Sequence, residues 1–292
     1  MSKYHQANTI RVTEVELTVH NLEIEQDFYL NRLGMHLVSK EPNKSILSLD
    51  GVHPFLTLHE DSFAPKRGRT TGLYHFAILL PSRKDLGIFL RHVIKHQIPI
   101  GGAADHGVSE AIYMSDPEGN GIEIYADKPD TLWHDEFNSL VMVTEELDYT
   151  GIYYSAEDSD VFEKLPEKTI IGHLHLSVSS LEKAKEFHVN ALGFQTTLDT
   201  FPQALFTGNS GYHHHLGLNT WMGHKNPPIG ALGLKSYTVN YPDCDAIHLA
   251  MKQLEALKYP IHEIDYGYQT KDFDGTLVNL KLDPSQRKNR QN

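Results

Sequence analysis

The sequence repeats itself at an offset of 159 residues. Residues 174–193 align with residues 15–34 without a gap, and the matched pairs are Leu17/Leu176, Val19/Val178, Leu22/Leu181, Phe28/Phe187, Leu33/Leu192 and Gly34/Gly193. Self-similarity at a fixed offset indicates a duplicated structural unit. The chain is therefore expected to fold as two related halves.

Each half is expected to contain two modules of one strand, one helix and three strands. Residues 11–19 alternate between apolar and polar side chains as a strand does, and residues 22–33 carry apolar side chains at helical spacing before Gly34. Short strands are predicted at 35–40, 45–50 and 54–59, further first strands at 73–80 and 234–241, and helices at 85–96 and 245–257. This pattern predicts an α+β fold of four βαβββ modules.

The modules suggest a division of the 292 residues into two domains. We expect modules 1 and 2 to form a domain over residues 9–127 and modules 3 and 4 a domain over residues 169–284. Residues 128–168 fit no module and are interpreted as a connecting segment, in which Trp133 and Phe137 are expected to pack. Residues 285–292 are expected to be a disordered tail.

Composition narrows the classes of partner. The net charge of −12 argues against a nucleic acid or an anionic membrane as a partner, and no apolar run approaches the roughly 18 residues of a membrane span. The polar start lacks the features of a signal peptide, and a single cysteine, Cys244, fits a reducing compartment. A cytoplasmic protein is therefore expected, and a homo-oligomer is compatible with the sequence.

The repeat allows equivalent positions to be compared within one chain. On the first strand of modules 1 to 4, one position holds Glu14, His75, His173 and Ser236; on the last strand, the compared position holds Phe55, Glu123, His215 and Asn279. Side chains that bind metals therefore gather in the two middle modules. Two imidazoles and one carboxylate form the facial set that leaves positions open on Fe(II), so we predict His75, Glu123 and His173 as metal ligands.

The stretch from Ala104 to Glu123 carries a further pattern. It contains His106, then after five residues Ile112 and Tyr113, then Asp116-Pro117-Glu118-Gly119, and finally Glu123. A histidine, a tyrosine and a glutamate are thereby placed on two predicted neighbouring strands joined by a turn. These residue types suit a mononuclear metal site with groups that handle protons.

Together these features resemble the vicinal oxygen chelate superfamily, which contains glyoxalases, bleomycin-resistance proteins and extradiol dioxygenases. The resemblance covers about 240 residues and implies that the four modules form two glyoxalase/dioxygenase-like barrels. The stretch is similar to the signature of two-domain extradiol catechol 2,3-dioxygenases, except that Ala104 stands where Gly, Asn, Thr, Ile or Val is usual.

The resemblance implies roles for individual residues. Glu123 corresponds to the carboxylate ligand, and His106 and Tyr113 correspond to groups that hydrogen-bond the bound catecholate. It also implies a histidine near the oxygen site on the last strand of the partner module. Of the run Tyr212-His213-His214-His215, we select His215 as this catalytic residue and expect His214 to be exposed at the end of a strand.

The implied reaction is the opening of a catechol by dioxygen, with both oxygen atoms incorporated, in the catabolism of aromatic compounds. The substrates would be a small aromatic diol and dioxygen, and the metal Fe(II), with Mn(II) as an alternative. Because module 4 lacks ligands, we expect modules 2 and 3 to enclose the metal, and modules 1 and 4 to pair as a structural barrel.

Two other functions stay open at this point. A glyoxalase-like metal-dependent isomerase or lyase, or a glutathione-transfer enzyme, would use His215 as a fourth ligand to nickel or zinc. A binding module without catalysis would need no metal ligands, and it ranks last.

Overall fold

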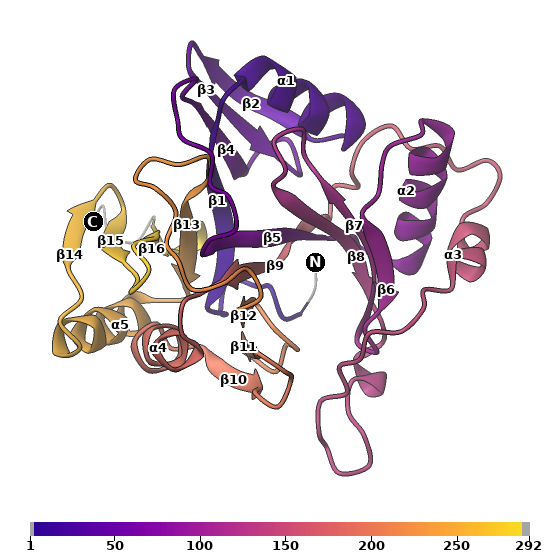
Figure 1. The fold of residues 1–292 in the computed structure, drawn as a ribbon. Helices are drawn as coiled ribbons and strands as arrows, with labels where there is room; N and C mark the ends of the chain where they lie inside the picture. The colour runs from indigo at the N-terminus through magenta and orange to yellow at the C-terminus, as the bar shows by residue number, and fades with distance from the viewer. Residues whose placement is uncertain (1–2, 288–292) are drawn as a thin grey trace. The chain divides into compact units, whose positions relative to one another are not determined.

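The computed structural model describes residues 3–287 and contains all four expected modules (Figure 1). Module 1 consists of β1 (Arg11–Val19), α1 (Leu22–Asp27), the π-helical turn η1 (Phe28–Arg32), β2 (His36–Glu41), β3 (Lys44–Ser48) and β4 (Pro54–Glu60). Module 2 consists of β5 (Gly72–Leu79), α2 (Arg83–Lys95), β6 (Gly102–Asp105), β7 (Ser109–Ser115) and β8 (Gly121–Asp127).

The second half repeats this order. Module 3 consists of β9 (Ile170–Ser177), α4 (Leu181–Lys185), the π-helical turn η3 (Glu186–Ala191), β10 (Gln195–Leu198), β11 (Ala204–Gly208) and β12 (Leu216–Asn219). Module 4 consists of β13 (Gly233–Tyr241), α5 (Cys244–Ala256), β14 (Ile261–Ile264), β15 (Gly267–Lys271) and β16 (Leu277–Leu282). The predicted strands and helices are thereby confirmed, with ends that differ by a few residues.

Each module helix begins at a polar residue whose side chain accepts a hydrogen bond from the backbone N–H three residues later. These N-caps are Asn21, Ser82, Ser180 and Asp243. In modules 1 and 3 the helix widens into a π-helical turn, which the periodicity of the sequence does not predict. Both turns are followed by a glycine with positive φ, Gly34 and Gly193, so the chain leaves the two helices in the same way.

The strands form two eight-stranded sheets, in the orders β14-β15-β16-β13-β1-β4-β3-β2 and β10-β11-β12-β9-β5-β8-β7-β6. The first sheet contains the strands of modules 1 and 4, and the second contains those of modules 2 and 3. This is the pairing of modules expected from the distribution of ligand-type residues. Within modules 2, 3 and 4, the first strand runs parallel to the last one.

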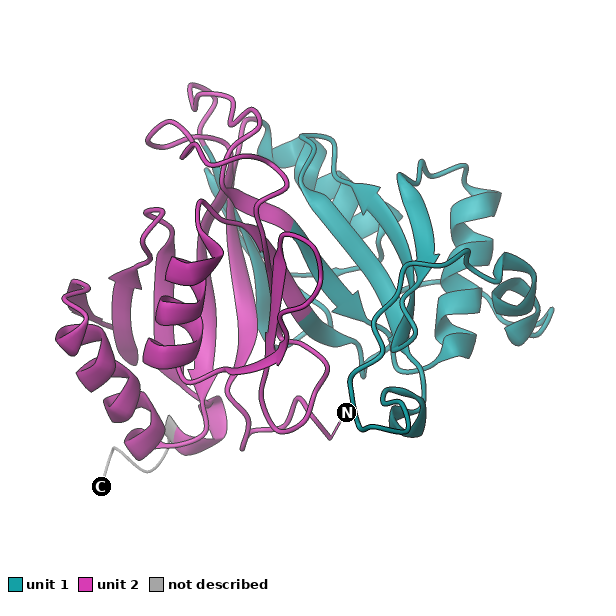
Figure 2. Cartoon of the chain, turned by 60° about the horizontal axis from the view of Figure 1, so that its bottom comes forward, with its two compact units in different colours: residues 1, 21–60, 75–172 teal, residues 2–20, 61–74, 173–292 magenta. Residues whose placement is uncertain are grey.

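Two compact units divide the chain, and Figure 2 colours them separately. Unit 1 contains residues 21–60 and 75–172, and unit 2 contains residues 61–74, 173–287 and the described residues before 21. Strand β1 belongs to unit 2 because it pairs with β13 along its length. The predicted domains 9–127 and 169–284 group the modules in their order along the chain, and their limits stay predictions.

The connecting segment belongs to unit 1 and contains η2 (Asp130–Leu132) and α3 (Tyr149–Ser155). Trp133 is buried as expected, but Phe137 is exposed, so the prediction that Phe137 packs is wrong. Helix α6 (Pro284–Arg287) extends into the expected disordered tail, so residues 285–287 are helical, and residues 288–292 lie outside the described part. Within residues 3–287, no helix has the length and apolar character needed to cross a membrane.

Candidate metal centre

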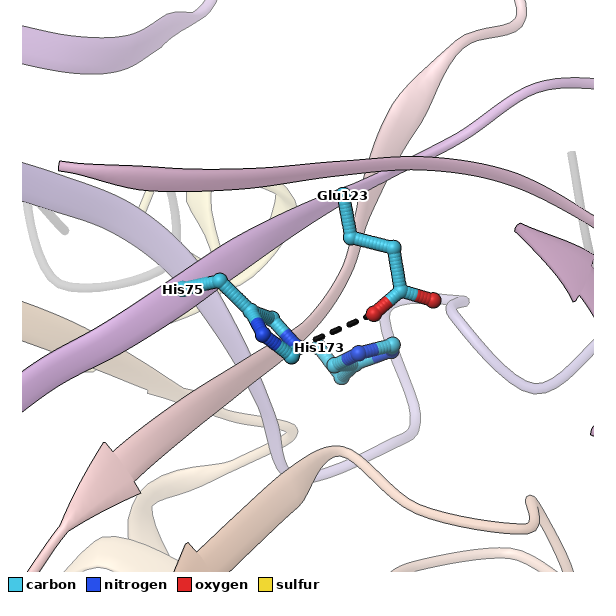
Figure 3. Close-up of side chains that lie close together, drawn as sticks. All are labelled: His75, Glu123 and His173. Carbon is cyan, nitrogen blue, oxygen red and sulfur yellow. Dashed lines mark ion pairs between the residues drawn. The ribbon is translucent and has the colours of Figure 1, made fainter. Parts of the chain in front are cut away.

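Three ligand-type side chains lie together, those of His75 on β5, Glu123 on β8 and His173 on β9 (Figure 3). One potential donor atom from each lies within 4.8 Å of the others, and all three side chains are buried. One ion could contact such donors at about 2.1 Å after small side-chain rotations. Two imidazoles and one carboxylate are a donor set that suits a divalent transition metal.

The register of the sheet explains how His75 and Glu123 meet. Strand β8 pairs with β5 so that Glu123 lies beside Ala77, and side chains two residues apart on a strand share a face. His75 therefore faces the same side of the sheet as Glu123. Its Nε2 lies 2.9 Å from Glu123 Oε2, which is the contact drawn in Figure 3.

A glycine precedes the third of these residues. A Cβ atom at Gly172 would collide with the hydroxyl and ring of Tyr125, a side chain that is fully buried. Glycine at position 172 thus allows β9 to pass close to this tyrosine immediately before His173. The backbone can take this course into His173 because residue 172 has no side chain.

His106 and Tyr113 form a hydrogen-bonded pair beside these ligand-type residues. The Tyr113 hydroxyl lies 2.6 Å from His106 Nε2, and His106 Nδ1 lies 2.8 Å from the carbonyl oxygen of Val143. Tyr113 is the cross-strand neighbour of Glu123, and its ring centroid lies 5.7 Å from that of His75. The structure therefore brings together the three residues that define the Ala104–Glu123 stretch.

His215 does not hold the position that the sequence comparison gave it. In module 3, Gly217 pairs with His175, just as Glu123 pairs with Ala77 in module 2. Because His175 and Ala77 each lie two residues after the first-strand histidine, Gly217 is the equivalent of Glu123. Equating His215 with Glu123 is therefore wrong by two residues.

The surroundings of His215 are those of a packed residue. Its Nδ1 accepts a hydrogen bond from the Asn209 backbone N–H, and its Nε2 lies 3.2 Å from the carbonyl oxygen of Tyr4. Burial, and then the nearby His5, lower the pKa of His215 well below its usual range. Both ring nitrogens are thus engaged by backbone groups, and these surroundings do not support the acid–base role expected for His215.

His214 is the member of the histidine run that lies against a ligand-type residue. Its ring centroid is 4.2 Å from that of His173, and its Nδ1 lies 2.8 Å from His213 Nδ1. His214 is buried, so the expectation that it is exposed is wrong. The run of three histidines indicated that one of them is a catalytic residue, but only the ring contact with His173 points to His214.

Aromatic side chains surround His175, which lies two residues after His173 on β9. The rings of Tyr74, Trp221 and Phe206 have centroids 5.3, 5.3 and 5.8 Å from that of His175. Phe206 and Trp221 thus both contact β9 through His175.

The equivalent positions in module 4 and on β1 carry a polar network. Glu14 accepts hydrogen bonds from Thr238 and from the ammonium group of Lys281, at 3.2 and 3.0 Å. Ser236 and Asn279, which occupy the places of His75 and Glu123, lie 3.5 Å apart. A lysine already neutralises the carboxylate here, so these residues fit a structural role.

Comparisons with known proteins give consistent results. A profile of the Glyoxalase/Bleomycin resistance protein/Dioxygenase superfamily matches residues 11–124 and 170–278. Catechol-2,3-dioxygenase of Bacillus subtilis is 43% identical over 264 residues, which cover 88% of this chain and 92% of that relative.

Two solved structures share the fold. A protein structure from Bacillus subtilis has a TM-score of 0.68 at 14% sequence identity, and the match covers 96% of this chain and 87% of that protein's chain. Glyoxalase I from Zea mays has a TM-score of 0.58 at 17% identity, with coverage of 96% and 94%. At such low identities these two similarities speak for the fold alone.

Proposed function

Because the chain belongs to the glyoxalase/bleomycin resistance protein/dioxygenase superfamily, we propose that it is a metal-dependent extradiol dioxygenase that opens a catechol ring with dioxygen. One observation carries the proposal: a two-histidine, one-carboxylate set lies beside a hydrogen-bonded histidine–tyrosine pair. The similarity to a catechol-2,3-dioxygenase over most of both chains supports the same reaction.

His75, Glu123 and His173 would hold the metal, for which we propose Fe(II), with Mn(II) as the alternative. Such an ion would act as a Lewis acid toward the two substrate oxygens and as a redox centre toward dioxygen. The ring bond next to the two hydroxyl-bearing carbons would break. Both atoms of dioxygen would enter the product, so no further reductant is required.

The surrounding side chains would bind the substrate and handle its protons. Tyr113, adjacent to Glu123 across the strands, would hydrogen-bond a substrate hydroxyl, and His106 would hold Tyr113 in place. We assign the acid–base role to His214 rather than His215, because the ring of His214 lies against that of His173. The resemblance to extradiol dioxygenases implies a histidine at this side of the site.

The isomerase alternative depended on His215 as a fourth ligand. Within the part of the chain that the structure describes, the ligand cluster consists of three residues, and His215 is bound to backbone groups instead. A three-residue set with an adjacent histidine–tyrosine pair favours the dioxygenase over the isomerase.

The direct test is anaerobic purification with metal analysis, followed by addition of catechol in air. We expect oxygen uptake in a one-to-one ratio with catechol, a yellow ring-opened product, and incorporation of both labelled atoms from isotopically labelled dioxygen. If no catechol consumes oxygen and the protein holds nickel or zinc tightly, the proposal is wrong.

A further inference from the structure

Part of the connecting segment is bound to the strand that leads into His106. Residues 141–145, which we term the support strand, run beside the end of β6. The Asp105 N–H donates to the Glu145 carbonyl at 3.0 Å, the Glu145 N–H donates to the Asp105 carbonyl at 2.9 Å, and the Val143 N–H donates to the His106 carbonyl at 3.1 Å. The support strand therefore extends the pairing of β6 up to His106.

The start of the support strand is itself anchored. The Val141 N–H donates to the carbonyl of Trp133 at 2.8 Å, and the Trp133 indole N–H donates to the carbonyl of Lys128 at 3.0 Å. Trp133 is buried, and the Lys128 ammonium contacts both carboxylate oxygens of Asp105. Residues 128–145 therefore form a loop that follows β8 and contacts Asp105 of β6 at both of its ends.

The hydrogen bonds of His106 define where its protons lie. A backbone carbonyl only accepts, so His106 Nδ1, 2.8 Å from the Val143 oxygen, must carry a proton. In the neutral imidazole, Nε2 is then an acceptor, and the only proton available between it and Tyr113 is that of the phenol. The carbonyl of Val143 therefore determines the direction of the His106–Tyr113 hydrogen bond.

We propose that the support strand is a positioning element, in which the Val143 carbonyl holds neutral His106 as the Nδ1–H tautomer and thereby makes Tyr113 a hydrogen-bond acceptor toward substrate. With its own proton directed to His106, Tyr113 offers a lone pair to a catechol hydroxyl, which is a donor. In the opposite tautomer His106 would donate to Tyr113, and the phenolic proton would be directed at the substrate hydroxyl. Only this consequence for substrate rests on the proposed function.

Gly107 offers a way to displace the support strand without touching His106 or Tyr113. A Cβ atom at Gly107 would lie 2.8 Å from the Val141 carbonyl oxygen and 3.4 Å from a methyl group of Val143. Gly107→Ala should therefore push the support strand away. Gly275→Ala is the matched control, because both glycines have positive φ, at +77° and +90°, and no atom lies within 4 Å of a Cβ at Gly275.

The readout is nitrogen-15 NMR of the histidine rings, with His106 identified by comparison with His106→Gln. We expect the Nδ1–H tautomer in the wild type and in Gly275→Ala, and loss of that tautomer in Gly107→Ala. We also expect kcat for catechol to fall about 10-fold in Gly107→Ala with unchanged metal content. Should Gly107→Ala fail to fold, Trp133→Phe, which removes the indole donor to Lys128, takes its place.

The proposal is overturned if His106 of the wild type is the Nε2–H tautomer, or if Gly107→Ala retains the Nδ1–H tautomer while kcat falls. In the second case the support strand has a purely structural role. The NMR experiment needs no turnover. If no catechol is converted, the proposed function fails, whereas the tautomer measurement still decides the role of the support strand.

Discussion

Replacement of Glu25 by glutamine should stabilise the protein at neutral pH. Glu25 lies on α1 and is fully buried near Asp116, whose carboxylate already accepts hydrogen bonds from the Tyr29 hydroxyl and from Asn120. Burial, and then the negative charge of Asp116, raise the pKa of Glu25 from its ordinary value of 4.5 to about 9. In the second half the repeat places buried Ala184 at this position, so the fold does not require a carboxyl group there.

The magnitude follows from the linkage between proton binding and folding. The folded chain keeps the Glu25 proton up to about pH 9, whereas the unfolded chain loses it above pH 4.5. The contribution of protonated Glu25 to the free energy of unfolding is therefore fully present below pH 4.5 and is lost as the pH rises toward 9. At neutral pH the loss amounts to roughly 3 kcal/mol, at about 1.4 kcal/mol for each pH unit above the unfolded pKa.

Glutamine keeps the size of the side chain and can donate to Asp116, but it cannot ionise. We therefore expect Glu25→Gln to raise Tm by roughly 5–10 °C at neutral pH and by little near pH 5. The assay is thermal unfolding followed by circular dichroism from about pH 5 to about pH 9. Glu23→Gln, which removes an exposed carboxylate from the same helix, is the control and should show no such pH-dependent gain.

Two results would contradict this prediction: a lower Tm of Glu25→Gln than of the wild type near pH 8, or a Tm that runs parallel to that of the wild type across the whole pH range. Either result would mean that Glu25 is ionised in the folded protein.

Further changes test the proposed site. Glu123→Gln should remove most of the bound metal, as measured by elemental analysis of the purified protein, because the neutral amide is a weak ligand. His106→Phe should retain the metal and lower kcat about 100-fold; an unchanged kcat would exclude His106 from the reaction. Gly172→Ala should destabilise the fold by about 1–3 kcal/mol in urea unfolding and reduce metal content, since the new methyl group collides with a buried tyrosine. His214→Ala should lower kcat about 100-fold with little change in metal content, whereas His215→Ala should mainly lower stability; the reverse order would restore His215 as the catalytic residue.

Patterns that are local in sequence predicted most of the architecture. The alternation of apolar and polar residues predicted the observed ends of β1, residues 11 and 19, because one face of that strand is buried and the other is not. Gly34 marked the end of the first helix, because glycine adopts the positive φ with which the chain leaves that helix. The repeat then identified His75, Glu123 and His173 as an exceptional set, since equivalent positions elsewhere hold other side chains.

Only the tertiary structure decided which residues surround that set. A shift of two residues leaves the alternation of a strand unchanged, so the sequence could not tell that Gly217, and not His215, matches Glu123. The pairing of the support strand with β6 joins residues nearly forty positions apart, and no local pattern encodes such a contact. Local periodicity depends only on the order of neighbouring residues, whereas register and long-range pairing depend on packing between segments that are distant in the chain.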